Sequence, residues 1–441
     1  MAEPSAILDA PRRERLLCLD AFRGFVIAAM LLVNMTWNSD SYQFHPQLSH
    51  VPFNTPAQGA TFTDLVFPWF LFIAGCAIPL SMKTGRGRSR SAQQKLMVAV
   101  RRGAVIYLLG VLLTVAGKAY STPVTWKDLF GWNILQLIGV GYICAVAVYL
   151  LPRKGQVVFV GLVLAVKLLL LTLIPADFLR AAMDTAGFAS RVSGGSPTGA
   201  GTFTHFDDVK RFMHLEHVKA LHLKDDAGFW STFGVYCAGW LGMSQQFLPC
   251  AAIAVMGGWC LEILTDQRKV KGARVARLAL FGSSALTICY LFQAGYNVNG
   301  GGWLGALTVP FSKWLFSPSY CLLAAGTGAI LLAMFYLLTD LFRVTKLNVL
   351  RIFGLNAIAV YVCAELSFKV VFAKWQIIYP NGFSGAVAGG LISWVGYWSD
   401  SFGMPSQVSL ALGAWSLPLI WILMWWLLCY WLWRRQIVVK L

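Results

Sequence analysis

The stretch PQLSHVPFNTPAQGATFTDLVFPWFLFIAG, residues 46–75, passes from a polar loop into an apolar segment. The apolar part continues without the alternation of a half-buried strand, so it predicts a membrane-spanning helix over 62–82. His50 lies in the loop, and Asp64 lies in the first turn of the predicted helix. The stretch therefore places an imidazole and a carboxylate at the mouth of a predicted membrane span.

The composition of the whole chain is that of a membrane protein. Of its 441 residues, 57% are hydrophobic and 12% are charged, whereas a soluble domain carries about 25% charged residues. Backbone polar groups in lipid must bond within the chain, so the continuous apolar runs predict a bundle of helices. We expect about ten transmembrane helices, over 19–37, 62–82, 98–117, 132–151, 157–175, 241–264, 277–296, 318–339, 350–371 and 409–432.

The positive charges predict the orientation of these spans. An even number of spans puts both termini on one side, and if that side is cytoplasmic, the cytoplasmic segments hold 23 of the 36 Lys and Arg residues. The net charge of +17 is therefore mainly a topology signal, and no nucleic-acid partner is expected. We expect an all-α polytopic membrane protein with residues 1–441 in a single transmembrane domain. The outer loops 38–61 and 176–240 are long, the second forming a subdomain, and 382–398 is apolar enough to be a re-entrant segment.

The cysteines and histidines do not predict a metal centre. The ten cysteines include no CxxC pair and fall mostly in or beside apolar runs, so neither a disulfide framework nor a zinc site is expected. Metal binding by the outer-loop histidines stays an alternative, but their pattern is not HExxH. These histidines are His205, His214, His217 and His222.

Several ionisable or amide side chains fall within the predicted spans, where such residues are costly and often functional. Asp20 and Arg23 are three positions apart on one helix face, which predicts a structural ion pair near the cytoplasmic interface or a ligand contact at that mouth. Asn34, near the outer end of the same helix, is placed to bond another helix or to orient a reacting group. Asp64 suits the first turn of a helix electrostatically, and it is also a candidate site residue.

Two further features have a structural and a functional interpretation. His50 is a solvated loop residue, or, if a carboxylate holds it, a proton or acyl acceptor. The basic segment 83–95, followed by Arg101 and Arg102, suits contact with anionic lipid or with a phosphorylated ligand.

Motifs spread from about residue 16 to 370 resemble the lysosomal heparan-α-glucosaminide N-acetyltransferase family and its bacterial relatives. The first is LDAFRGFVIAAMLLVN, followed by a polar loop that ends in histidine and by TDLVFPWFLFIAGCAIPLSM. The later ones are GWNILQLIGVGYICA, PFSKWLFSPSYCLLAAG and FGLNAIAVYVCAE, and all occur in the order typical of the family.

The resemblance implies a membrane acetyltransferase that takes acetyl-CoA from the cytoplasm and acetylates an amino sugar on the other side. Its reactive histidine matches His50 by the PQLSH context, with His45 as the runner-up. Asn34 matches the assisting asparagine, and Asp64 matches the motif carboxylate. Two departures stand out: the 14-residue spacing from His50 to Asp64 is longer than in the family, and Leu137 replaces an arginine.

For acetyl-CoA as co-substrate, the candidate binding residues are Arg101, Arg102, Gln136, Lys313 and Asn356. The expected partners are acetyl-CoA, an amino-sugar or glycan acceptor and membrane lipids, in a bacterial inner membrane, with a homodimer left open. Direct transfer and transfer through an acetyl-histidine both stay open. The alternative functions are O-acetylation of an envelope glycan, transport of a sugar or lipid without acyl transfer, and a non-catalytic scaffold.

Overall fold

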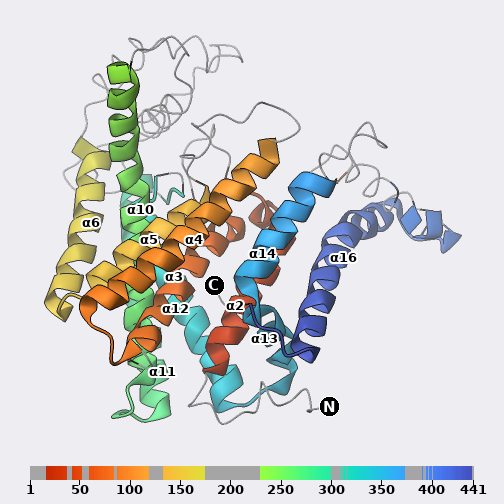
Figure 1. Ribbon diagram of the computed structural model, residues 1–441. Coiled ribbons are helices and arrows are strands. Elements are labelled where there is room, and N and C mark those ends of the chain that lie inside the picture. Colours follow the sequence, from red (N-terminus) through yellow and green to blue (C-terminus); the bar gives the residue numbers. More distant parts are fainter. Residues whose placement is uncertain are drawn as a thin grey trace.

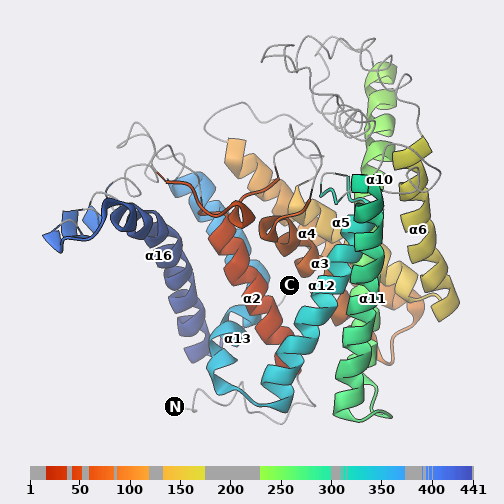
Figure 2. The same cartoon turned by 180° about the vertical axis from the view of Figure 1, so that it is seen from behind.

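The computed structural model of the chain is a bundle of helices (Figures 1 and 2). It describes residues 16–36, 42–51, 59–83, 87–118, 133–173, 229–298, 309, 311–313, 315–372, 390, 394–395, 397–399 and 401–439. All regular structure in this part of the chain is helical, as expected. The helices are α2 (Leu17–Val33), η1 (Pro46–Leu48), α3 (Phe62–Lys83), α4 (Ala92–Lys118), α5 (Ile134–Tyr149), α6 (Arg153–Leu173), α10 (Phe229–Thr265), α11 (Lys271–Val298), α12 (Pro318–Tyr336), η5 (Leu337–Leu341), η6 (Thr345–Leu347), α13 (Asn348–Leu355), α14 (Ala357–Leu366), η7 (Ser367–Phe372) and α16 (Ser406–Arg434).

Each of the ten predicted apolar stretches overlaps a helix. Six helices are long and apolar enough to cross a membrane, and a bent pair makes a seventh candidate when it is taken as one span. The six are α3, α4, α11 and α16, the Gln246–Thr265 part of α10, and α12 together with η5. The chain is therefore a helical membrane protein.

The predicted span 350–371 corresponds to a bent helix pair, because the chain turns by 63° between α13 and α14. Asn356 lies at the break, with φ and ψ of −122° and 30°, outside the helical region. Its side chain bonds the backbone of residues 437–439. The two bonds fix the side chain of Asn356 at the break, between the end of α13 and the segment that follows α16.

Parts of the predicted outer segments lie outside the described residues. Most of 176–240 is among them, except that α10 already begins at Phe229, twelve positions before the predicted start of that span. Only scattered residues of the predicted re-entrant segment 382–398 are described, so that prediction is not tested. From the loop 38–61, the structure describes 42–51 and 59–61, which are the parts that hold His45 and His50.

Close packing of α2 on α13 fixes one wall of the bundle. A Cβ at Gly24 would overlap the carbonyl oxygen of Leu350, and one at Gly354 would overlap the carbonyl oxygen of Asp20. The two helix backbones therefore touch, as small residues allow in membrane bundles. This contact holds α2 beside the break at Asn356, and both cavities described below border on α2 and α14.

Candidate active site

The loop that precedes α3 is fixed to both neighbouring helices. The hydroxyl of Thr36, just after α2, donates to the Leu48 carbonyl over 3.2 Å. The hydroxyl of Thr63, in α3, donates to the Gln47 carbonyl over 3.1 Å. These bonds hold the short helix η1 in place, and His50 follows it by two residues.

His50 is paired with Asp64. Its Nδ1 lies 2.8 Å from Asp64 Oδ1, and the side chains of His50 and Asp64 are 51% and 2% exposed. The other carboxylate oxygen accepts from the Val51 N–H, the Thr61 N–H and the Thr61 hydroxyl, at 3.3, 3.3 and 3.0 Å. An ionised carboxylate only accepts, so Nδ1 carries the proton and Nε2 is left as the basic nitrogen.

Asp64 also belongs to a capping arrangement. The Thr61 hydroxyl accepts from the Asp64 N–H at 3.3 Å, while the Asp64 carboxylate accepts from the Thr61 N–H. Such reciprocal bonds satisfy backbone donors at the start of a helix. The cap and the contact with His50 are therefore compatible, because they use different oxygens of one buried carboxylate.

Lys313 completes the cluster. Its Nζ lies 3.5 Å from Asp64 Oδ1 and 3.1 Å from His50 Nδ1, and its side chain is 19% exposed. Burial lowers the pKa of Lys313, and the carboxylate of Asp64 partly offsets that effect. Tyr320 fixes the same region, because its hydroxyl donates to the Asp64 carbonyl oxygen over 2.5 Å. Lys313 was predicted to bind acetyl-CoA, and the structure places it with His50 and Asp64.

A cavity of about 580 Å³ opens beside this cluster, and we call it the His50 cavity. It lies where α2, α4 and α14 end and where α3 and α5 begin. Its walls combine apolar side chains with hydroxyls, amides, one imidazole and one ion pair. The lining residues are Val33, Asn34, Thr36, Leu48, Ser49, His50, Thr63, Leu113, Thr114, Asn133, Ile134, Leu135, Tyr361, Glu365, Phe368 and Lys369.

Asn34 is held by a carboxylate in the wall of this cavity. Its Nδ2 donates to Glu365 Oε1 over 2.6 Å, and Glu365 Oε2 lies 3.3 Å from Lys369 Nζ. Asn34 caps the carboxyl end of α2, and Glu365 comes from α14. Asn34 was predicted either to bond another helix or to orient a reacting group; the structure shows the first contact and places the amide at the cavity wall.

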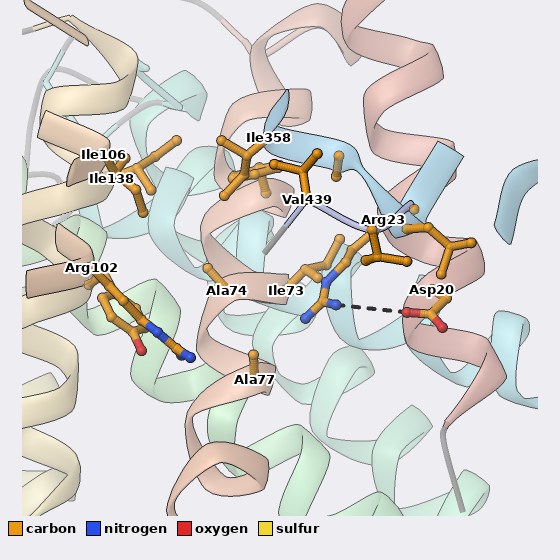
Figure 3. A pocket seen from close by; sticks show the side chains of 16 residues that line it. Asp20, Arg23, Ile73, Ala74, Ala77, Arg102, Ile106, Ile138, Ile358 and Val439 are labelled. Atoms are coloured by element: carbon orange, nitrogen blue, oxygen red, sulfur yellow. Dashed lines mark ion pairs between the residues drawn. The ribbon is translucent and has the colours of Figure 1, made fainter. Parts of the chain in front are cut away.

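A second cavity, of about 360 Å³, lies toward the other end of the same helices, and we call it the Arg23 cavity. Asp20 and Arg23 form an ion pair of 3.8 Å at its edge. Figure 3 shows Arg23 and Arg102 reaching into it from α2 and α4, above Ala77. Arg101, the neighbour of Arg102, is not among the lining residues.

The end of the described chain forms part of the wall of the Arg23 cavity. Residues 437–439 leave α16 and run to the break between α13 and α14, where the Val439 N–H donates to Asn356 Oδ1 over 2.8 Å. Asn356 Nδ2 donates in turn to the Ile437 carbonyl over 3.4 Å. Val438 and Val439 then line the cavity. Asn356, which was predicted to bind acetyl-CoA, does not line the Arg23 cavity itself. It holds residues 437–439 in place, and two of these line the cavity.

Two other predicted site residues have structural partners. His45 caps η1, where its Nδ1 accepts from the Gln47 N–H over 3.2 Å, and it does not line the His50 cavity. Gln136 is fully buried, and its side-chain oxygen accepts from the Asn133 N–H over 2.9 Å in the cap of α5. Nothing in the sequence indicated that Asn133 would contact both Gln136 and α4. Its side-chain nitrogen donates to the Thr114 hydroxyl over 2.9 Å.

Among the described residues there is no group of three or more His, Cys, Asp or Glu side chains that could hold a metal ion. The four outer-loop histidines from His205 to His222 lie outside that part of the chain. The His50 cavity itself is lined by an imidazole, the carboxylate of Glu365, the ammonium group of Lys369 and several amides and hydroxyls.

Long apolar helices around two cavities that combine apolar and charged side chains define an integral membrane protein. Residues 15–188 match the family described as "Heparan-alpha-glucosaminide N-acetyltransferase, catalytic". The matched region includes His50, Asp64 and the helices α2 to α5. The resemblance to this acetyltransferase family is therefore confirmed over the amino-terminal part of the chain.

Two mammalian proteins named heparan-alpha-glucosaminide N-acetyltransferase are similar to parts of the chain. The mouse protein is 34% identical over 128 residues, which are 29% of this chain and 18% of that protein. The human protein is 31% identical over 140 residues, or 32% of this chain and 20% of that protein. The aligned part thus spans about a fifth of the length of these relatives.

Proposed function

We propose that this chain is a membrane acetyltransferase, which moves an acetyl group from cytoplasmic acetyl-CoA to an amino sugar or related glycan at the outer face. The observation that carries the proposal is the pair of cavities along one set of helices. Arg23, near the middle of α2, and Asn34, at its carboxyl end, line different cavities. They are eleven positions apart, which is about 16 Å along a helix.

The two cavities approach each other most closely along α5 and α14. Leu135 and Ile138 line different cavities, and so do Tyr361 and Ile358. Each pair is three positions apart, which is about 4.5 Å of helix rise. A slender pantetheine arm has to pass between the helices at this point if its thioester is to reach His50 while its nucleotide stays near Arg23 and Arg102. Guanidinium groups suit the phosphates of that nucleotide.

His50 acts as the base in the proposed transfer. The acceptor amine attacks the thioester carbonyl, a C–N bond forms, and a nitrogen proton passes to His50 Nε2. The C–S bond then breaks, and the departing thiolate takes the proton from the imidazole. Asp64 holds the Nδ1 proton, so that Nε2 is the nitrogen that takes the acceptor's proton, and its negative charge stabilises the imidazolium that forms; Lys313 balances the charge of that carboxylate.

The topology that fits this reaction has ten spans and both termini in the cytoplasm, within one transmembrane domain of a bacterial inner membrane. It puts the Arg23 cavity on the side where acetyl-CoA is made and the His50 cavity on the outer side. The excess of Lys and Arg in the segments on the first side supports this orientation.

The test uses purified full-length protein, acetyl-CoA and a panel of amino sugars and neutral sugars, with free thiol and acetylated product both measured. We expect thiol release with an amino sugar, its loss in His50→Ala and its retention in His45→Ala. Product formed only with hydroxyl acceptors would indicate O-acetylation. If vesicles accumulate sugar without thiol release, the chain is a transporter and the proposal is wrong.

A further inference from the structure

Glu365 is the acidic side chain that faces the His50 cavity. Among the described lining residues it is the one carboxylate, because Asp64 lies behind His50 and does not line the cavity. Its side chain is 15% exposed, so it is largely shielded from solvent. It stands on α14, close to the end of α2, where its Oε1 accepts from Asn34.

Asp64 cannot serve an incoming cation in the same way. Its two oxygens already accept from His50, Val51 and Thr61 and form an ion pair with Lys313, and its side chain is 2% exposed. A primary ammonium that enters the His50 cavity loses water, and such burial is costly unless a negative partner is present. Glu365 is the group in the cavity that can supply this partner.

The present cationic partner of Glu365 is replaceable. Lys369 lies 3.3 Å from Glu365 Oε2 in an i,i+4 pair, and its side chain is 37% exposed. An i,i+4 ion pair whose lysine is this accessible to solvent contributes little to stability. An ammonium group bound in the cavity can therefore take the position of the Lys369 amine, while Oε1 keeps its bond to Asn34.

The orientation of Asn34 follows from the same contact. A carboxylate only accepts, so the nitrogen of the Asn34 amide must face Glu365. The carboxamide oxygen is then turned away from Glu365 and is an additional acceptor at the wall for an N–H of the ligand. Glu365 and Asn34 together form a receptor for a hydrogen-bond donor that carries positive charge.

We propose that Glu365 binds the ammonium group of the acceptor and selects amino sugars over neutral sugars. This inference rests on the proposed acetyl transfer, and it assigns the acceptor subsite to the wall that carries Asn34. The bound ammonium loses one proton to solvent before attack, and the resulting amine gives its second proton to His50. Net transfer thus yields the amide, the free thiol and one proton.

The test compares the binding of glucosamine and glucose to the full-length protein in detergent. Wild type is expected to bind glucosamine more tightly than glucose. Glu365→Gln keeps an oxygen for Asn34 but removes the charge, so we expect glucosamine affinity to fall about tenfold or more, as loss of a charge-assisted contact implies. Glucose and acetyl-CoA affinities are expected to stay within about twofold, since neither contact uses that charge.

Lys369→Gln is the matched control, because it removes the competing cation and leaves the carboxylate. It is expected to tighten glucosamine binding or leave it unchanged. If Glu365→Gln preserves the preference for glucosamine, or if wild type has none, the inference is overturned even though acetyl transfer occurs. If wild type shows the preference but transfers no acetyl group, the proposed function fails while this subsite stands.

Discussion

The most informative single substitution is Asp64→Asn. Its amide oxygen can replace the carboxylate oxygen that accepts from Val51 and Thr61, so the start of α3 is preserved. The amide nitrogen then faces His50 and Lys313, which are now opposed by a donor. His50 Nδ1 must accept instead of donate, so the proton moves to Nε2 and the base is lost.

The magnitude follows from these contacts. Loss of one hydrogen bond to a charged group costs about 1.5–3 kcal/mol, or roughly 10- to 100-fold in rate. Loss of a general base costs about 10²- to 10⁴-fold. We therefore expect kcat to fall by about 10²- to 10⁴-fold, with the KM for acetyl-CoA changed less than about threefold because Arg23 and Arg102 lie in the other cavity.

The assay is thiol release from acetyl-CoA with saturating amino sugar, alongside a thermal unfolding curve for each variant. Thr61→Val is the matched control. It removes the hydroxyl that donates to Asp64 Oδ2 and leaves the contact between His50 and Asp64 Oδ1 intact. We expect it to lose less than about tenfold in kcat, the value of about one ordinary hydrogen bond. A folded Asp64→Asn enzyme that keeps more than about a tenth of the wild-type kcat would refute the tautomer argument.

Three further outcomes are expected. Arg102→Ala raises the KM for acetyl-CoA about tenfold while Arg101→Ala changes it less than about twofold, in steady-state assays, because only the first lines the Arg23 cavity; equal effects would contradict this placement. Gly24→Ala lowers the unfolding free energy by about 3 kcal/mol or more, because its methyl group would overlap the backbone of α13. The control Gly161→Ala changes it by about 1 kcal/mol at most, because a methyl group there has no neighbour within 4 Å. If the denaturation curves of the two variants coincide, the α2–α13 contact is contradicted. Burial lowers the pKa of Lys313 below its ordinary 10.5, so at pH values between the folded and unfolded pKa the unfolded chain binds more protons, and the free energy of unfolding rises with pH. Wild type should therefore gain stability relative to Lys313→Met as the pH rises toward 10.5. A constant difference between the two proteins across a pH series would exclude this charge effect.

The helices were predictable because their apolar runs are long and continuous. The break at Asn356 was not, since the apolar run continues through it and the cause is a contact with residues 437–439, more than eighty positions away. The early start of α10 at Phe229 also escaped prediction, because the polar outer segment gives no clear boundary before it.

The candidate site was predictable in part. His50 and Asp64 are close in the chain. One lies in the first turn of a helix and the other in the loop before it, which was enough to predict that they form a pair. Lys313 and Glu365 are more than 240 and 300 positions from these residues, so no local pattern shows that Lys313 meets the pair or that Glu365 meets Asn34. Both residues were visible in quoted motifs, but only packing of α12 and α14 against α2 and α3 shows their partners.

The central claim is that an acetyl group crosses the bundle from one cavity to the other by way of His50. The direct measurement uses sealed vesicles that contain the full-length protein, with radiolabelled acetyl-CoA outside and glucosamine inside. We expect labelled N-acetylglucosamine to form inside the vesicles with wild type and not with His50→Ala. Absence of lumenal product with wild type, or equal product with His50→Ala, would contradict the account.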